Sequence, residues 1–307
     1  MKLLIIGASG VLGSRLHNDA IKKKWNVLGT YCSHERVGLS YLDVRDKNSL
    51  EKVFNFFKPE VVVMAGGITD VDLCTLKPKL AEDVNIKGTL NMVKEIKEYG
   101  SKLVYVSTDY IFDGENGPYK ENNKPNPINI YGKTKLEAEN IIRSKLKDNL
   151  IVRTAQLYGA LHLRGGQNAL LAGGEVKVVQ TNNFTIKIIH NMQNNKKVYA
   201  ADDLYSTPTY SGSLSDILIK LIEKNSEGIY HGAGAEFLSR YDYVNKIADM
   251  FELDKGLIQR VKLKDLKLKA KRPRKGGLKI DKICSIVEIK VNNVDYYLKL
   301  LKTDITS

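Results

Sequence analysis

The chain has 307 residues, of which 43% are hydrophobic and 27% charged, the balance of a globular protein with room for a sizeable core. No apolar run approaches the ~20 residues that a membrane span needs, and the three cysteines have neither metal-ligand nor disulfide-framework spacing. This composition argues against a membrane protein and a disulfide scaffold, and it predicts a protein of the reducing cytoplasm.

The formal net charge of +13 is concentrated in one part of the chain. Residues 255–282 contain twelve lysines and arginines and only two aspartates, which leaves +10 in this stretch. Such a stretch is typical of a solvated surface, of a site that attracts an anionic small substrate, or of a nucleic-acid-binding surface. Because no aromatic residues interleave the charges and no nucleic-acid motif accompanies them, we expect no nucleic-acid partner.

Hydrophobic periodicity predicts strands and helices in alternation through the first half of the chain. The predicted strands are Leu3–Ile6, Asn26–Thr30, Val61–Met64, Leu103–Ser107 and Leu150–Arg153. The predicted helices are Val11–Lys24, Asp46–Phe57, Pro78–Tyr99 and Tyr131–Lys147. Such a βαβ rhythm predicts an α/β fold with a doubly wound parallel sheet of the Rossmann type, covered by helices on both faces.

The second half of the chain is less regular. It contains two helical patterns, Leu214–Lys224 and Tyr241–Met250, and a short strand pattern, Gly228–His231. Residues 159–195 show no clear pattern apart from a strand-like alternation over Glu175–Gln180. We therefore predict a first domain over 1–155, with a returning segment near 204–231, and a smaller second domain that takes up most of 156–307.

A glycine-rich turn joins the first predicted strand to the first predicted helix. A turn with so few side chains lets a pyrophosphate approach the backbone N–H groups at the helix N-terminus, although a glycine turn without a ligand is the alternative. The residues that would form this phosphate cradle are Gly7, Ser9, Gly10, Val11, Leu12 and Gly13.

The end of the second strand bears on the choice of cofactor. An acidic residue directly at this end would hold the ribose 2′-hydroxyl of NAD, and none is present. Ser33, His34 and Arg36 could instead receive a 2′-phosphate, with Glu35 as the competing residue, so the pattern favours NADPH and leaves NADH open. Small residues at the end of the third strand, Ala65, Gly66 and Gly67, would let the cofactor pass close to the backbone.

Tyr131 and Lys135 are the candidate proton-transfer pair. Their spacing of four places both side chains on one face of a helix, where an ammonium group would lower the pKa of a phenol. A hydroxyl at the end of the preceding strand, Thr108 or in reserve Ser107, would complete a proton-donating site. A lone pair with this spacing is more often an ordinary helix-surface pair, and the glycine-rich turn upstream argues against that alternative here.

These segments together resemble the extended short-chain dehydrogenase/reductase family. The match narrows to its dTDP-4-dehydrorhamnose reductase branch, which includes the related regulatory beta subunit of methionine adenosyltransferase. The resemblance is nearly continuous to Arg153-Thr154 and patchy beyond. It is carried by Gly7–Gly13, Ala65–Asp72, Val84-Asn85, Ser107–Gly114, Pro118–Glu121 and Tyr131–Lys135.

The resemblance implies a role for each of these candidates. Tyr131 would protonate a sugar carbonyl oxygen as hydride arrives, Lys135 would hold the nicotinamide ribose and lower the pKa of Tyr131, and Thr108 would bind the carbonyl. It also implies adenine contacts for Asp43 and Val44. The implied sugar-binding residues are Thr69, Val71, Thr108, Tyr110 and Gln156. Some members use Mg²⁺, but the sequence shows no cluster of metal ligands, so no metal residues are assigned and Mg²⁺ is left open.

Several departures from the branch concern the substrate side. Gln156 stands where the branch often has a tryptophan. The string Asp203–Thr209 keeps only the Asp and Pro-Thr of the family pattern, Arg272-Pro273 lacks the serine that follows it, and residues 160–182 are diverged or additional.

The expected function is NAD(P)H-dependent reduction of the 4-keto group of a nucleotide sugar, dTDP-4-dehydrorhamnose to dTDP-rhamnose first. The alternatives are a non-catalytic, cofactor-binding regulatory subunit, and a nucleotide-sugar epimerase or dehydratase with tightly held NAD. The expected partner is the nucleotide-sugar substrate rather than nucleic acid or a membrane, and a homodimer is left open.

Overall fold

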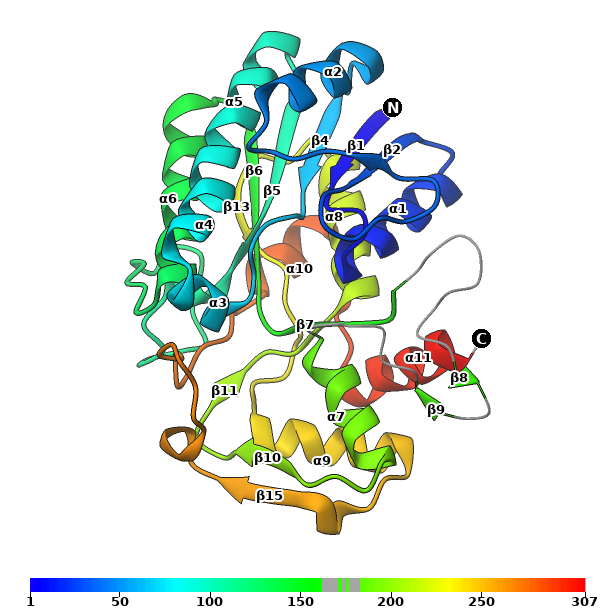
Figure 1. Ribbon diagram of the computed structural model, residues 1–307, viewed down its shortest axis with the longest axis vertical. Helices are drawn as coiled ribbons and strands as arrows, with labels where there is room; N and C mark the ends of the chain where they lie inside the picture. Colours follow the sequence, from blue (N-terminus) through cyan, green and yellow to red (C-terminus); the bar gives the residue numbers. More distant parts are fainter. Residues whose placement is uncertain (162–170, 173–174, 177–182, 307) are drawn as a thin grey trace.

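Seven parallel strands form the central sheet, in the order β13-β6-β5-β4-β1-β2-β3 (Figure 1). A computed structural model describes residues 1–161, 171–172, 175–176 and 183–306. The strands are β1 (Lys2–Ile6), β2 (Asn26–Tyr31), β3 (Ser40–Tyr41), β4 (Val61–Met64), β5 (Lys102–Thr108), β6 (Asn149–Thr154) and β13 (Gly228–His231). The predicted doubly wound Rossmann sheet is confirmed.

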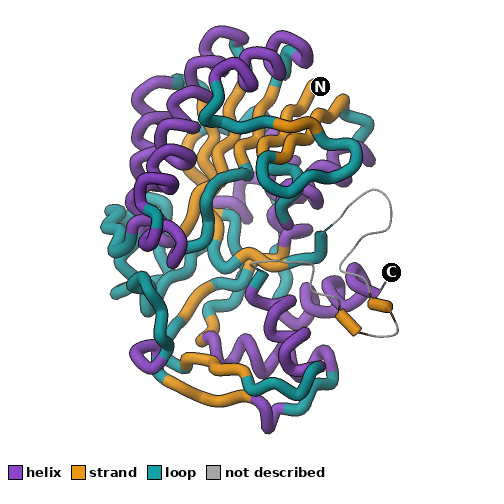
Figure 2. Tube along the Cα trace, in the orientation of Figure 1, coloured by secondary structure: helices purple, strands orange, loops and turns teal. Residues whose placement is uncertain are grey.

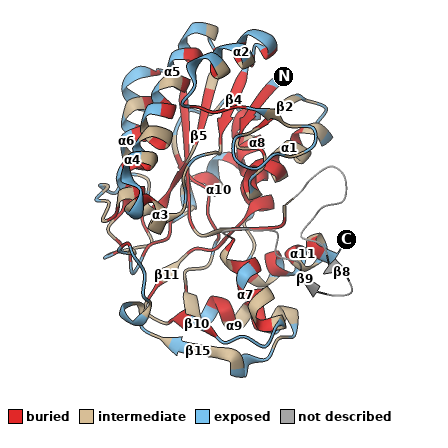
Figure 3. Cartoon of the chain, viewed as in Figure 1, coloured by how far each residue is buried: buried red, intermediate tan, exposed pale blue. Residues whose placement is uncertain are grey.

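Helices cover both faces of this sheet because successive side chains of each strand point to opposite faces. Leu3 and Ile5 of β1 belong to one core cluster, which includes side chains of three helices: α1 (Val11–Lys22), α8 (Ser211–Glu223) and α10 (Asp281–Val287). Leu4 and Ile6 belong to the opposite cluster, with α2 (Lys47–Phe57), α5 (Gly88–Tyr99) and α6 (Ile130–Lys145). Figure 3 shows the strands as the buried centre between these two layers.

The chain reverses its direction of travel across the sheet beside β1. From β1 it proceeds to β2 and β3 on one side, and from β4 to β5 and β6 on the other. The carboxyl ends of β1 and β4 therefore flank the point where ligands bind in open α/β sheets. Gly7 follows β1 and Ala65 follows β4 at this point.

A second, smaller group of elements lies below the sheet in Figures 1 and 2. Three helices, α7 (Phe184–Gln193), α9 (Arg240–Phe251) and α11 (Val294–Thr306), share a core with the parallel pair β10 (Val198–Ala201) and β15 (Ile258–Val261). Two short pairs connect this group to the sheet: β7 (Leu157–Tyr158) with β12 (Thr209–Tyr210), and β11 (Tyr205–Ser206) with β14 (Leu238–Ser239). Strands β8 (Leu171–Ala172) and β9 (Glu175–Val176) form a further pair.

These two cores support a division into two domains, which we propose as the organisation of the chain. The first domain would comprise 1–155 and the segment that returns near 204–231, because α8 packs on α1 and β13 pairs with β6. Helix α10 also packs on α8, so a second return belongs with the first domain. The remainder of 156–307 would form the smaller domain.

The helix predicted over Pro78–Tyr99 is interrupted. The chain runs through α4 (Pro78–Glu82), a π-helical turn over Asp83–Lys87, and then α5. Periodicity does not detect a single wider turn, because the apolar face continues on either side of it. π-helical turns of this kind are frequent at functional sites.

Several elements were not predicted. Helix α3 (Val71–Leu76) begins where the carboxylate of Asp70 accepts a hydrogen bond from the Leu73 amide at 2.9 Å. The other elements without a prediction are the helices α7, α10 and α11, the strands β3, β7, β8, β10, β11, β12, β14 and β15, and short 3₁₀ turns at Asp109–Ile111, Lys255–Leu257 and Leu263–Asp265. Of the strand predicted over Glu175–Gln180, β9 covers the first two residues and the rest lies outside the described residues. Of the helices that the structure describes, none is long and apolar enough to cross a bilayer.

Candidate functional site

The three candidate catalytic side chains lie at the carboxyl end of β5 and the start of α6. Thr108 is the last residue of β5, and Tyr131 and Lys135 occupy successive turns of α6. The side chain of Asn129 caps this helix by accepting a hydrogen bond from the Gly132 amide at 2.9 Å, which places Tyr131 in the first turn. Thr108, Tyr131 and Lys135 are 5%, 8% and 5% exposed, so all three are buried together.

The Tyr131 phenol does not show the lowered pKa that its spacing from Lys135 predicted. Burial raises the pKa of Tyr131 well above its usual value, and the Thr108 hydroxyl partly opposes this by a side-chain hydrogen bond. The charges of Asp109, Tyr110 and Cys74 act in the same direction as burial. The phenol therefore holds its proton firmly at neutral pH.

Lys135 explains this difference. Its Nζ donates a hydrogen bond to the Val106 carbonyl at 2.7 Å and lies 3.9 Å from the centre of the Tyr105 ring. Burial lowers the pKa of Lys135 to about 7, opposed by the charge of Glu139. Glu139 is itself held in a buried ion pair at 2.7 Å with Arg153. An amine that is only partly protonated near pH 7 exerts little charge on a neighbouring phenol.

Thr108 is held by the residues that follow it. Its hydroxyl donates to the Asp109 carboxylate at 3.3 Å and accepts from the Tyr110 amide at 3.2 Å. The other oxygen of Asp109 accepts from the Gly277 amide at 3.0 Å, and burial raises the pKa of Asp109 to about 6. Ser107, the reserve candidate, has a buried hydroxyl without a hydrogen-bond partner among the described residues.

The π-helical turn places Asn85 behind these residues. The Asn85 amide donates to the Ile68 carbonyl at 3.0 Å and to the Thr134 hydroxyl at 3.1 Å, and its oxygen accepts from the Ile68 amide at 2.9 Å. Asn85 thus connects the loop after β4 to the turn of α6 that carries Lys135. The residue analysis gave it no role, although Val84-Asn85 is one of the segments that carry the family resemblance.

The glycine turn between β1 and α1 is shaped for a closely approaching ligand. Gly7 has a φ of +84°, and a Cβ there would lie 2.6 Å from the Gly66 Cα. A Cβ at Gly13 would lie 2.2 Å from the Gly7 carbonyl oxygen, so glycine is required at both positions. Gly10 is exposed and begins α1 without a side-chain cap, which leaves helix N-terminal amides free for an anion.

The remaining residues of the turn differ in their exposure. Ser9 and Val11 are partly exposed, whereas Leu12 belongs to the core and could offer only its backbone. At the end of β4, Ala65 and Gly66 are partly exposed and Gly67 is exposed. A pyrophosphate between these two turns would meet backbone on both sides, which fits a dinucleotide cofactor.

Beyond the end of β2, Arg36 is available for a further anionic group. The Arg36 Nε is buried without a hydrogen-bond partner, whereas Ser33 is exposed and contacts His34 Nδ1 at 2.9 Å. The competing Glu35 carboxylate hydrogen-bonds the Tyr31 phenol, whose pKa is raised by burial and by that carboxylate. An unpaired guanidinium at this end fits a 2′-phosphate better than a 2′-hydroxyl.

The expected adenine contacts lie nearby at the start of the next loop. Asp43 and Val44 are both buried, and Arg45 binds the Asp43 carboxylate, with Nη2 at 2.6 Å, and lowers its pKa. The Val44 carbonyl accepts from the Asn91 amide at 3.1 Å. Adenine contact by these two residues stays a prediction.

The expected sugar-binding residues fall into two groups. Val71 and Tyr110 pack against Tyr131, with the two tyrosine rings 5.6 Å apart, and Thr69 is exposed on the loop just before α3. Gln156 lies on the loop that follows β6, in the left-handed region at a φ of +39°, with its buried Nε2 unpartnered among the described residues. A strained residue with an unpaired amide is typical of a ligand-contacting position.

The basic stretch 255–282 is only partly free. Arg260 and Lys262 both bind Asp202, each at 2.7 Å, Arg274 binds Asp203 at 3.3 Å, and Arg272 binds Asp72 at 3.0 Å. Six lysines of the stretch are exposed and make no side-chain hydrogen bond or ion pair to any residue that the structure describes: Lys264, Lys267, Lys269, Lys271, Lys275 and Lys279.

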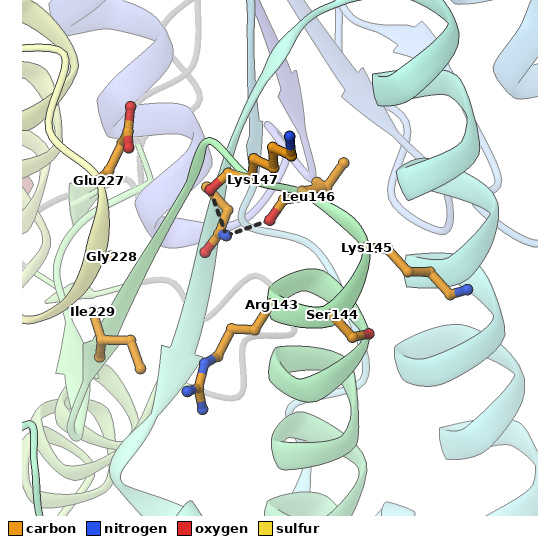
Figure 4. Close-up of a pocket in the computed structure, with 9 residues that line it drawn as sticks. Arg143, Ser144, Lys145, Leu146, Lys147, Glu227, Gly228 and Ile229 are labelled. Carbon is orange, nitrogen blue, oxygen red and sulfur yellow. Dashed lines mark hydrogen bonds between the residues drawn. The ribbon is translucent and has the colours of Figure 1, made fainter.

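A hollow of about 630 Å³ lies away from all of these residues (Figure 4). It is lined by the C-terminal end of α6 and by the first residues of β6 and β13, including Arg143, Lys147 and Gly228. The Asn149 amide donates to the Leu146 carbonyl at 2.9 Å beside it. Because this is the amino-terminal edge of the parallel sheet, the hollow is not part of the candidate site. Elsewhere among the described residues, no three His, Cys, Asp or Glu side chains gather as metal ligands would.

A family model described as the RmlD substrate binding domain matches residues 1–306 of the chain. The chain belongs to the RmlD family. Among its relatives, methionine adenosyltransferase 2 subunit beta of Xenopus tropicalis is 30% identical over 257 residues, 82% of this chain and 72% of the relative. The dTDP-4-dehydrorhamnose reductase of Aggregatibacter actinomycetemcomitans is 28% identical over 314 residues, 98% of each chain.

A solved RmlD-family structure has the same fold along its whole length. It is the dTDP-4-dehydrorhamnose reductase from Bacillus anthracis, in complex with NADP, with a TM-score of 0.85 and 23% identity over 99% of both chains. The predicted family and fold are therefore confirmed. The roles of individual residues in this RmlD-family chain stay predictions, and the lowered pKa expected for Tyr131 is wrong for the reason given above.

Three residues around the candidate catalytic side chains had no predicted role: Asn85, Asp109 and Arg240, whose charge acts on Tyr110. The first two lie within strings that carry the family resemblance, so their positions could have drawn attention. Arg240 has no local signal, because its neighbours in space are distant in sequence.

Proposed function

We propose that the protein reduces the 4-keto group of a nucleotide sugar with NADPH, dTDP-4-dehydrorhamnose to dTDP-rhamnose being the first candidate reaction. The observation that carries the proposal is the burial of Thr108, Tyr131 and Lys135 at one carboxyl edge of the sheet that also presents the glycine turn. The 98% coverage of both chains in the alignment with a dTDP-4-dehydrorhamnose reductase supports the choice of substrate.

Tyr131 would act as the general acid. A carbonyl oxygen gains negative charge as it is reduced, and a positioned donor must supply a proton to it. The raised pKa keeps Tyr131 protonated, so it enters the reaction in the form that donates. Thr108, oriented by Asp109, would also hydrogen-bond to the substrate carbonyl oxygen. After proton transfer it would stabilise the phenolate form of Tyr131.

Lys135 would serve two purposes. Its Nζ is a donor that could hold ribose hydroxyl groups, and its protonated form would favour the tyrosinate formed after proton transfer. A pKa of about 7 means that a modest gain in interaction converts the amine to ammonium at neutral pH. When bound, NADPH supplies the hydride.

The cofactor assignment rests on Arg36 and on the glycine turn. The open N-terminus of α1 at Gly10 would take the pyrophosphate, and the unpaired guanidinium of Arg36 would take the 2′-phosphate. NADH would leave that guanidinium without a partner, so we propose NADPH as the preferred cofactor.

The test is oxidation of NADPH and NADH, followed by absorbance, over a panel of 4-keto nucleotide sugars that begins with dTDP-4-dehydrorhamnose. Tyr131→Phe should fold and bind NADPH with unchanged affinity while kcat falls by on the order of 10²–10⁴-fold. Tyr99→Phe is the control, because it removes a phenol at the end of α5, where the hydroxyl contacts Asn55 and no candidate site residue. Unchanged turnover in Tyr131→Phe would contradict the mechanism.

A second candidate function has its own support. The likeness to methionine adenosyltransferase 2 subunit beta, together with Gln156 at a position that often carries tryptophan, favours a cofactor-binding regulatory subunit. It predicts a stable complex with a partner enzyme and no NADPH oxidation with any sugar of the panel. Size-exclusion chromatography with light scattering distinguishes this complex from a homodimer.

A further inference from the structure

Arg240 lies near the candidate catalytic residues and has no anionic partner among the residues that the structure describes. It is the first residue of α9, and its guanidinium lies 4.3 Å from the centre of the ring of Phe184, the first residue of α7. Burial raises the pKa of Tyr110, whose ring packs on Tyr131, and the nearby charge of Arg240 opposes that rise. Arg240 thus extends from the smaller group of elements toward the carboxyl edge of the sheet.

No described residue pairs with this side chain. Its Nε is buried without a hydrogen-bond partner, and its guanidinium makes no hydrogen bond or ion pair to any residue that the structure describes. Arg153 and Arg15, by contrast, are paired, with Glu139 at 2.7 Å and with Asp19 at 2.7 Å, and the half-buried Arg36 that also lacks a partner is the residue assigned above to an anionic group of the cofactor. The desolvation of an unpaired guanidinium is costly, so such a group is retained where a ligand supplies the missing anion.

The surroundings of Arg240 increase this cost. Arg272 faces it with a like charge, and burial together with Arg272 lowers the pKa of Arg240. The nearby carboxylate, Asp72, is already occupied by Arg272 Nη2 and by the Ala270 amide, both on its Oδ1. A cation at the first position of a helix is also unfavourable, because the helix dipole is positive there.

We propose that Arg240 binds the diphosphate group of the nucleotide-sugar substrate. This inference rests on the proposed function, because that function brings a diphosphate-linked sugar to Tyr131. A planar guanidinium can donate two parallel hydrogen bonds to phosphate oxygens, so a diphosphate would supply the anionic partner that the described residues do not provide. The Phe184 ring packs against the guanidinium, and Arg272 adds positive charge nearby.

The test replaces Arg240 by methionine, which keeps an unbranched stem over Phe184 and removes only the charge and the donors. Affinity for dTDP and for UDP is measured by calorimetry in the presence of NADPH, and the thermal midpoint is measured without nucleotide. Arg260→Met is the matched control, because Arg260 also lies over an aromatic ring, that of Tyr241, but is paired with Asp202. Arg240→Lys retains the charge without the fork.

The expected result is at least a tenfold rise in the Kd of the nucleoside diphosphate in Arg240→Met, a smaller rise in Arg240→Lys, and less than a twofold change in Arg260→Met. The thermal midpoint of Arg240→Met should equal or exceed that of the unmodified protein, since an unpaired buried charge has been removed. A residue that merely supported the fold would lower it.

Two results would overturn the inference: a Kd for both diphosphates within twofold of the unmodified protein in Arg240→Met, or no binding of either diphosphate by the unmodified protein. A lowered midpoint in both Arg240 variants with equal loss of affinity would also overturn it. The binding measurement needs no turnover, so it decides the role of Arg240 even if no sugar of the panel is reduced.

Discussion

Replacing Lys135 by methionine would measure what it costs to bury this amine. Burial lowers the pKa of Lys135 from 10.5 to about 7. Each pKa unit corresponds to about 1.4 kcal/mol, so the folded protein disfavours the ammonium form by on the order of 5 kcal/mol. Methionine has a similar length and would keep the contact with the Tyr105 ring.

The pH dependence follows from the direction of this shift. Below pH 7 the lysine is charged in both the folded and unfolded states, and the whole penalty acts on the folded state. Between pH 7 and 10.5 the folded protein has released the proton while the unfolded chain still holds it, so the penalty shrinks as pH rises. The methionine variant should therefore be the more stable protein at pH 6, and its advantage should narrow by about 3 kcal/mol between pH 6 and pH 9.

Urea unfolding of the cofactor-free protein over this pH range is the appropriate assay. Loss of the hydrogen bond to the Val106 carbonyl lowers the free energy of unfolding of the variant by about 1 kcal/mol at every pH. The decisive quantity is therefore how the difference in unfolding free energy between the two proteins changes with pH. Lys133→Met is the matched control, because Lys133 is exposed on the same helix and should give a difference that does not vary with pH. A constant difference between wild type and Lys135→Met would refute the reasoning.

Further predictions concern the cofactor, the pH profile and the basic stretch. Arg36→Met should raise the KM for NADPH by about tenfold or more and leave that for NADH within twofold, as measured by steady-state kinetics; equal effects on both would exclude a 2′-phosphate contact. Asp109→Asn should remove a change in kcat centred near pH 6, because the carboxylate that orients Thr108 titrates there, and a pH profile identical to wild type would contradict this. Lys271→Ala should raise the KM for the nucleotide sugar and make that KM less dependent on salt. Arg274→Ala should have a smaller effect, because Asp203 already neutralises Arg274. Salt-independent KM values in both variants would assign the stretch to solvated surface.

Local signals were sufficient for the first half of the fold and for the identity of the candidate catalytic residues. The apolar runs of β1, β4, β5 and β6 are buried on both faces, so each reads as a strand without knowledge of its neighbours. Gly13 is required by a contact within its own turn, Gly7 adopts the positive φ that such a turn needs, and the spacing of Tyr131 and Lys135 is a property of one helix. Such features depend on a few adjacent residues, which is why the sequence alone predicts them.

The structure of the second half of the chain and the pKa values of the candidate site depended on packing between residues that are distant in sequence. Helix α11 was not predicted, and it belongs to the core of the smaller group because it packs against α9. Burial lowers the pKa of Lys135, and that burial arises because the side chain of an α6 residue packs against Tyr105 and Val106 of β5.

The sequence by itself determined the fold class and singled out the candidate cofactor cradle and the candidate proton-transfer residues, because these depend on periodicity and spacing within single elements. Only the tertiary structure decided that Lys135 is partly protonated near pH 7 and that Asp109 titrates near pH 6, and only it showed that Arg240 has no counter-ion among the described residues. Burial and charge pairing depend on side chains that are distant in the chain, 29 residues apart for Lys135 and Val106 and 168 for Asp109 and Gly277, and no local pattern records which of them will meet.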